Sequence, residues 1–359
     1  MTAAAASRAR RWERPGLLLA AGVIVAMALI ALPVLLREQT RDWTAYEQAA
    51  VRLESGAPLY VWTLATEADE YYLYPPGMAA AWSIAGSPEL LLLVKVVSLL
   101  AVGALAPLVV RDPSRKLLAA GVIGAGALIW PPNMHDLILG NVMALYVGAL
   151  AIVIAKRGWL GAAPLGVVLA LAAKPAILPF AIWLLLTRPR DAARVAVAGL
   201  AVSAVVTVLF GPGRYVEYLE ALPRMTTVAV SFTGNVGLVM ISPVASVVGV
   251  VAALGLAVLA GLRVDARRGA SIVLAAMLLA QPTIGFNYAG LLYPALVLLW
   301  AADRPVGTLA FVLATPLMLV SPVGAAVLVI VLALASWFAG RGEPGADEPG
   351  AAANELATA

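Results

Sequence analysis

The chain contains no cysteine and a single histidine among its 359 residues. The first absence excludes disulfides and cysteine-ligated metals, and the second excludes a metal site built from several histidines. Charged residues are also scarce, at 12% against about 25% in a typical soluble domain. Hydrophobic residues make up 62%, and the mean hydropathy is +0.94. Most of the chain is therefore expected to lie in a lipid bilayer.

Apolar runs separated by charged or Pro/Gly-rich turns predict an all-α polytopic membrane protein with about 12 transmembrane helices. We expect a basic N-terminus (1–16), a transmembrane domain (17–340) and a tail (341–359) that is disordered, because it has too few apolar residues to pack. The first apolar run exceeds the usual signal-peptide core of about 7–15 residues, so we interpret it as a retained helix. The predicted spans are 17–36, 87–109, 117–131, 141–155, 159–173, 175–187, 193–210, 236–262, 270–282, 288–301, 305–320 and 322–339.

The positions of the basic residues predict the orientation. With the N-terminus in the cytoplasm, most of the 24 Lys and Arg residues fall on the inner side through all the predicted spans, as the positive-inside rule requires. This pattern explains the net charge of +4 without a nucleic-acid partner. Both termini are then cytoplasmic, and the long loops 37–86 and 211–235 lie outside a bacterial plasma membrane, with shorter outer loops at 132–140 and 283–287.

Asp42 lies just after the first predicted span. Residues 44–53 read as a short helix, with Thr44 and Glu47 as a capping box and Gly56 near its end. The apolar face of this helix can lie along the membrane surface, which would hold Asp42 at the lipid–water boundary. With an ordinary pKa of about 3.9, Asp42 would be ionised at neutral pH and able to accept a proton. The alternative is a solvated loop carboxylate.

Aromatic residues are concentrated in the same predicted loop, with Tyr46 on the short helix and Tyr71, Tyr72 and Tyr74 before Pro75. The cluster of Tyr71, Tyr72, Tyr74, Pro75 and Pro76 forms either an aromatic belt where the chain enters the bilayer or a platform for a sugar ring or a polyprenyl head group. Tyr46 and Tyr74 are candidate substrate contacts.

The only histidine, His135, lies among Asn133, Asp136 and Asn141 in a predicted outer loop before a helix. Backbone N–H groups at a helix N-terminus favour anions, so His135 and Asn141 are candidate substrate contacts. A solvated loop histidine is the alternative. Asn235 and Asn287 add polar side chains on the same predicted face.

Lys174 lies at the outer end of the span 159–173. An ionisable residue at that depth is costly and indicates function, here pairing with a phosphate, although a lysine can also extend its ammonium to the interface. Arg214 and Arg224, in the second long loop, are either further phosphate contacts or plain surface charges. Lys95 lies nearer a helix centre, and no partner for it can be read from the sequence.

These motifs, in their order, resemble glycosyltransferase family 87, the polyprenyl-phosphate-mannose-dependent α-mannosyltransferases of actinobacteria, within the GT-C superfamily. The resemblance covers about residues 40 to 295. It rests on an Asp after the first span, a following Tyr, and short segments in a fixed order: Asp42, Tyr46, Arg52-Leu53, Gly56, Pro58-Leu59-Tyr60, Tyr72-Leu73-Tyr74-Pro75-Pro76, Gly140-Asn141 and Lys174-Pro175.

The resemblance implies a GT-C-like fold with a helical first outer loop, in which Asp42 is the catalytic base. Tyr74, Asn141 and Lys174 fall on motif positions of the family. Where its late outer loop carries Trp and His, this chain has Phe286-Asn287-Tyr288, so a role of that His falls to Asn287, to His135 or to no residue.

An outward-facing sugar transferase needs a donor carried across the membrane on a lipid, and no nucleotide-binding Gly-rich motif occurs in the sequence. We therefore expect transfer of a sugar from a polyprenyl-phosphate donor to a glycolipid or glycan, with inversion and without a cofactor or metal. The resemblance indicates mannose. The alternatives are a polyprenyl-phosphate-pentose (arabinose) transferase, a non-catalytic scaffold, and a polytopic carrier or flippase. A carrier would need acidic residues inside the spans, whereas all acidic residues are predicted in loops or tails.

Overall fold

The computed structural model describes residues 22, 24–26, 29, 42–62, 71–230, 237–281 and 284–341. Within these ranges every regular element is a helix and no strand occurs, which confirms the predicted all-α class. The basic N-terminus and the tail from 342 lie outside the described residues, as does most of the first predicted span.

The α-helices are α2 (Trp43–Glu54), α3 (Pro76–Ala85), α4 (Pro88–Leu100), α5 (Ala106–Val109), α6 (Lys116–Ile129), α7 (Pro131–Leu139), α8 (Met143–Ala155), α9 (Trp159–Ala172), α10 (Leu178–Thr187), α11 (Pro189–Phe210), α12 (Gly213–Val230), α13 (Pro243–Leu262), α14 (Ala266–Leu279), α15 (Leu292–Ala302), α16 (Arg304–Val320) and α17 (Pro322–Arg341). Short 3₁₀ turns include η1 (Ala101–Leu105), η3 (Pro175–Ile177) and η5 (Phe286–Leu291).

Each predicted span from residue 87 onward coincides with a helix, alone or extended by a 3₁₀ turn. Only four helices of the described residues are long and apolar enough to cross a membrane, however: Pro88–Val109, Pro189–Phe210, Pro243–Leu262 and Pro322–Gly340. The other apolar helices have 10–17 residues, or about 15–26 Å at 1.5 Å per residue, which is short of a core about 30 Å thick. By length and composition, four helices of the described residues can therefore cross a membrane on their own, and the remaining predicted spans stay a prediction.

A fifth span is formed if α6 and α7 are counted together. The two helices meet at an angle of 62°, as in a broken span or a re-entrant loop. The segment 132–140, predicted as an outer loop, is helical because Pro131 and Pro132 start α7 with preset helical φ angles. Gly140 then ends α7 with a φ of +78°, in the left-handed region that favours glycine.

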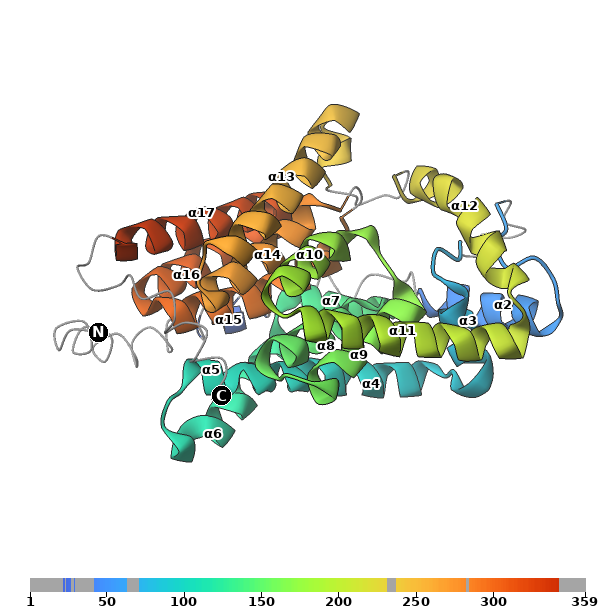
Figure 1. The fold of residues 1–359 in the computed structure, drawn as a ribbon, viewed down its shortest axis with the longest axis horizontal. Coiled ribbons are helices and arrows are strands. Elements are labelled where there is room, and N and C mark those ends of the chain that lie inside the picture. The colour runs from blue at the N-terminus through green and yellow to red at the C-terminus, as the bar shows by residue number, and fades with distance from the viewer. Residues whose placement is uncertain are drawn as a thin grey trace.

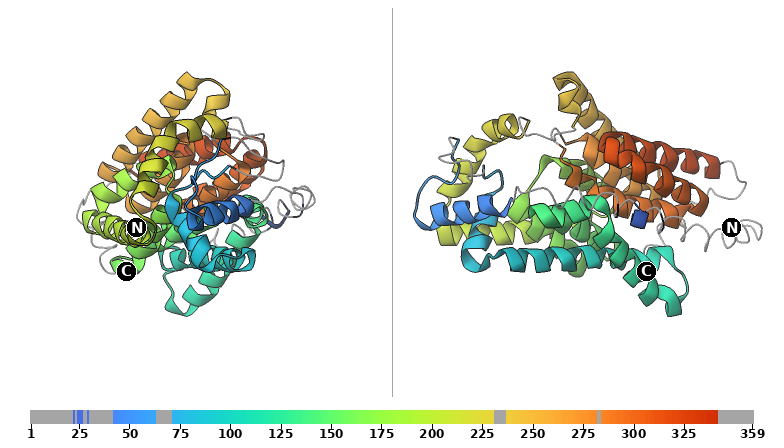
Figure 2. Two further views of the ribbon diagram at one scale, coloured as in Figure 1. Left: turned by 90° about the vertical axis from the view of Figure 1, so that its right-hand side faces the viewer. Right: turned by 180° about the vertical axis from the view of Figure 1, so that it is seen from behind.

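The second predicted long loop, 211–235, also contains a helix, α12. One of its faces is buried through Ala221 and Met225, while Val216 and Leu219 on another face are exposed. Figures 1 and 2 show α2, α3 and α12 gathered at one end of the elongated molecule, where α11 also ends. We call this the α2–α3–α12 end.

Helix α2 confirms the predicted short helix after Asp42 but not its cap. The N-cap residue is Asp42, without a side-chain capping bond, so Thr44 and Glu47 do not form a capping box. The face of Tyr46, Ala49 and Leu53 is buried and packs on α3 rather than on the membrane surface.

The helices of the body approach one another closely through small residues, as is common in membrane proteins. At Gly148, in the middle of α8, a Cβ atom would lie 2.2 Å from the carbonyl oxygen of Ser98 in α4. By contrast, α13 projects from the body (Figure 1) and exposes Val244, Val248 and Val251. An exposed apolar face on a helix of this length fits contact with lipid.

Candidate functional site

Asp42 is held at the junction of α7 and α2. Its backbone N–H donates to the carbonyl oxygen of Leu139 at 2.7 Å, and its carboxylate accepts a hydrogen bond from the Asn141 side-chain amide. The Asn141 Oδ1 in turn accepts from the N–H of Val142 at 2.7 Å, which fixes the amide orientation. The left-handed turn at Gly140 brings the chain back against α2, so Asp42 and Asn141, predicted separately, belong to one site.

The surroundings of Asp42 change its proton affinity. Burial raises the pKa of Asp42 above 3.8, while the hydrogen bond from Asn141 and the charge of Lys174 oppose this shift. The prediction of an unperturbed loop carboxylate is therefore wrong, because the side chain is only partly exposed. A raised pKa makes the carboxylate a better proton acceptor than an ordinary aspartate.

Lys174 lies where the chain is extended between α9 and η3. Its Nζ donates to the Tyr288 hydroxyl at 2.6 Å and lies 4.5 Å from the centre of the Tyr288 ring and 5.2 Å from that of Tyr74. Within the part of the chain that the structure describes, no carboxylate lies within ion-pair distance of Lys174. The ammonium is therefore half-buried among neutral phenols, which favours an anionic ligand.

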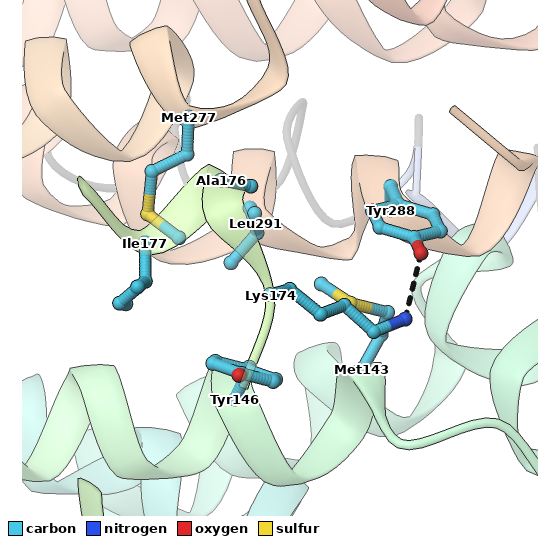
Figure 3. Close-up of a pocket in the computed structure, with 8 residues that line it drawn as sticks. All are labelled: Met143, Tyr146, Lys174, Ala176, Ile177, Met277, Tyr288 and Leu291. Atoms are coloured by element: carbon cyan, nitrogen blue, oxygen red, sulfur yellow. Dashed lines mark hydrogen bonds between the residues drawn. The ribbon is translucent and has the colours of Figure 1, made fainter. Parts of the chain in front are cut away.

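A small pocket adjoins Lys174 (Figure 3). Aliphatic and Met side chains from α8, η3, α14 and η5 form most of its wall, including Met143, Ile177 and Met277. The Tyr146 ring lies in the same wall, and its hydroxyl donates to the carbonyl oxygen of Ala172 at 2.6 Å. The Lys174 ammonium therefore lies at the edge of an apolar wall, next to which an anionic group could bind.

The aromatic residues at the α2–α3–α12 end form a packed cluster. The rings of Tyr46 and Tyr74 are 5.2 Å apart, edge to face, and Tyr60 donates to the carbonyl oxygen of Tyr74 at 2.9 Å. Tyr72 donates to the carbonyl oxygen of Pro75 at the start of α3. Tyr72 is almost fully buried, so the predictions of an open sugar platform and of a membrane belt do not fit it, and Tyr46 is fully buried rather than on the membrane surface. Both rings support Tyr74, whose ring contacts Lys174.

A buried ion pair that was not predicted lies beside this site. Lys95 in α4 and Asp136 in α7 are 1% and 0% exposed, with Nζ and Oδ2 3.1 Å apart. The Asp136 carboxylate also accepts from the Asn287 amide at 3.2 Å. The expectation that all acidic residues lie in loops is thus wrong for Asp136. The available signal was a lysine inside an apolar span, which requires a buried counter-ion.

His135 is not a solvated loop residue either. It lies in α7, is 7% exposed, and its ring packs 5.6 Å from that of Phe286 in η5. His135 and Asn287 therefore belong to the layer around Asp136, and the Asn287 amide is already bonded there. These contacts favour a supporting role for both residues over direct contact with a substrate.

The two arginines of α12 have other contacts. Arg214 donates to the carbonyl oxygen of Ala57 at 2.9 Å and pairs with Glu217 at 3.1 Å, which fastens α12 to the chain after α2. The exposed Arg224 lies over the Trp62 ring at 5.3 Å. Neither set of contacts supports the predicted phosphate role, and Asn235 lies outside the described residues.

Among the residues that the structure describes, no group of three or more His, Asp or Glu side chains could hold a metal ion. The contacts described above define a candidate site of Asp42, Asn141, Lys174, Tyr74 and Tyr288. Tyr288 is an addition to the predicted substrate contacts. Comparisons of the chain with protein-family models, curated proteins and solved structures find no match, so a functional proposal rests on these residues and their geometry.

Proposed function

We propose that this protein is a membrane glycosyltransferase that moves a sugar, mannose in the first instance, from a polyprenyl-phosphate donor to a glycolipid or glycan acceptor. The observation that carries the proposal is the joining of a carboxylate of raised pKa, Asp42, and a cation without a carboxylate partner, Lys174, in one site. Tyr74 lies within electrostatic reach of both groups. A sugar transfer from a phosphate donor requires a proton acceptor and an anion-binding group in one site.

The reaction is a single displacement. The acceptor hydroxyl oxygen forms a bond to the anomeric carbon as the bond from that carbon to the phosphate oxygen breaks. Asp42 takes the hydroxyl proton, and the electron pair leaves with the polyprenyl phosphate, whose added charge Lys174 stabilises. Attack opposite the leaving group inverts a β-linked donor to an α-glycoside.

Two features support a lipid-carried donor. The wall beside Lys174 is apolar, so a phosphate bound by the ammonium would lie next to apolar surface, as the phosphate of a prenyl lipid does. The helix surfaces expose many large apolar side chains, as expected for a protein whose substrate arrives through the bilayer.

The proposed architecture is a GT-C-like fold of about 12 spans in a bacterial plasma membrane, with both termini cytoplasmic. Under it the α2–α3–α12 end faces outward. The short helices such as α8 and α9 then cross the bilayer together with their adjoining turns.

A carrier is the second candidate, because Asp136 and Lys95 form a buried ion pair of the kind that couples ion movement in transporters. The contacts of Asp136 argue against it: besides Lys95, two backbone N–H groups and the Asn287 amide occupy the carboxylate. An ion would have to displace these donors.

The test uses purified protein in liposomes with radiolabelled polyprenyl-phosphate-mannose and a crude glycolipid acceptor fraction. We expect Asp42→Asn to lower transfer by about 10²-fold or more, since it removes the base, while donor binding persists because the amide keeps the bond with Asn141. A pentose donor run in parallel distinguishes mannose from arabinose. Normal transfer by Asp42→Asn would refute the base assignment, and ion-driven uptake without any transfer would favour the carrier.

A further inference from the structure

The Lys95–Asp136 pair is the most strongly buried charged contact among the described residues. Removing two charges from water costs several kcal/mol per ion, which the pair recovers only with good geometry and additional hydrogen bonds. The proposed reaction does not use either side chain, so their retention requires another explanation.

Asp136 joins four elements. Its carboxylate meets Lys95 from α4, and the backbone N–H groups of Met143 and Ala144, at 3.1 and 3.0 Å, bring in the start of α8. The amide of Asn287 adds η5 at 3.2 Å. The Lys95 ammonium donates as well to the carbonyl oxygen of Asp136. The Asp136 carboxylate thus accepts from four donors, and the Lys95 ammonium donates to two acceptors, all within the protein.

Two short connections lead from this pair to the candidate site. The carbonyl oxygen of Asp136 accepts from the N–H of Gly140 at 3.1 Å, and the next residue, Asn141, bonds to Asp42. On the other side, Asn287 precedes Tyr288, which accepts from Lys174.

We propose that Lys95 and Asp136 are a positioning pair that fixes the Asp42–Asn141 half of the site relative to the Lys174–Tyr288 half. The inference rests on the proposed function for its catalytic consequence. The structural part of the inference, that the buried Asp136 carboxylate sets the environment of Asp42, does not depend on which activity the site has.

The pair also acts on Asp42 electrostatically. The groups that face Asp42 are Asn141, Lys174, Asp136 and Lys95, with the phenols of Tyr46 and Tyr74 interacting as well. The charge of Asp136 raises the pKa of Asp42, and the charge of Lys95 lowers it. Neutralising Lys95 should therefore move the titration of Asp42 to higher pH, and neutralising Asp136 should move it to lower pH.

The experiment compares Lys95→Met, Asp136→Asn and the double variant, with Arg194→Met as the control. Arg194 also pairs with an aspartate, Asp191, at 2.7 Å, but it is not among the groups that act on Asp42. One readout is the pH dependence of kcat/KM for polyprenyl-phosphate-mannose. The other is the pH dependence of Asp42 labelling by dicyclohexylcarbodiimide, which reacts with protonated carboxyl groups and is read by mass spectrometry without turnover.

We expect the labelling midpoint to shift up in Lys95→Met, down in Asp136→Asn, and back toward wild type in the double variant. Because a displacement of about 1 Å can cost about 10²-fold in rate, each single variant should lose about 10- to 100-fold in kcat/KM. The control Arg194→Met should leave the labelling midpoint unchanged. If the folded Lys95→Met and Asp136→Asn variants also leave it unchanged, the inference is overturned. Opposite shifts without sugar transfer by the wild type would keep the positioning pair and reject the proposed function.

Discussion

The close contact between α4 and α8 gives a prediction that depends on geometry alone. A Cβ added at Gly148 would lie 2.2 Å from the Ser98 carbonyl oxygen, so the two helices would have to separate by about 0.8 Å to reach even 3.0 Å. Overpacking of this kind costs about 1–3 kcal/mol. Alanine also stabilises a helix relative to glycine by about 0.5–1 kcal/mol, and this stabilisation partly offsets the cost of the steric clash.

Gly121 supplies a matched control. It lies in the middle of α6 with nothing within 4 Å of an added Cβ. Gly121→Ala therefore has the helix-stabilising effect of alanine without a steric clash. The difference in unfolding free energy between Gly148→Ala and Gly121→Ala therefore isolates the steric term, expected at about 1–3 kcal/mol.

The assay is thermal unfolding of both variants in one detergent at one scan rate, because membrane proteins unfold irreversibly and apparent Tm values depend on the rate. We expect Gly148→Ala to have a Tm several degrees below that of Gly121→Ala. Separating α4 from α8 also strains the Lys95–Asp136 contact, so sugar transfer should fall in the same variant. Equal Tm values would mean that α4 and α8 are not in close contact, and the placement of Lys95 would be in doubt.

Three further predictions concern single side chains. Lys174→Met should weaken binding of polyprenyl phosphate at least 10-fold in a tryptophan-fluorescence titration, with Lys174→Arg closer to wild type because it keeps the charge. Arg224→Ala should change transfer less than twofold, since the exposed guanidinium contacts only the Trp62 ring among the described cation–π pairs; a large loss would restore its phosphate role. Asp42→Asn should be at least as stable as wild type in thermal unfolding at neutral pH. Burial raises the folded-state pKa of Asp42, so the ionised carboxylate destabilises the fold. The difference in stability between variant and wild type should therefore vanish as the pH falls to 3.8 and below, where the carboxyl becomes protonated in both states. A lower Tm for Asp42→Asn at neutral pH would contradict the raised pKa.

The helices could be predicted from the sequence because apolar runs and their Pro and Gly boundaries are local signals. The number of membrane spans stays a prediction, because several predicted spans are helices of only 10–17 residues and apolar character alone does not fix helix length. The prediction failed at α7, where Pro131 and Pro132 suggested a loop but occupy the first turn of a helix. A proline is compatible with either outcome until the following residues are known to pack.

The site shows the same division between local and long-range information. Asp42, Asn141 and Lys174 were identified as polar residues in unusual positions, and the fold brings them together. The partner of Lys95 could not be found, because Asp136 lies 41 residues away on a segment predicted as a loop. Tyr46 and Tyr72 were assigned to surfaces because sequence does not distinguish a buried aromatic ring from an exposed one.

Lys95, which is buried, and Lys174, which is half-buried, differ in the groups that surround their charges. Lys95 faces a carboxylate and a carbonyl oxygen of Asp136, so its charge is compensated, and removing it should cost stability, by about 3–5 kcal/mol for a broken buried pair. Lys174 faces only phenol oxygens and ring faces at contact distance among the described residues. Its charge lacks full compensation in the folded chain, so removing it should cost little stability and much anion affinity. The presence or absence of a carboxylate partner, rather than depth in the membrane, therefore identifies Lys95 as the supporting lysine and Lys174 as the anion-binding one.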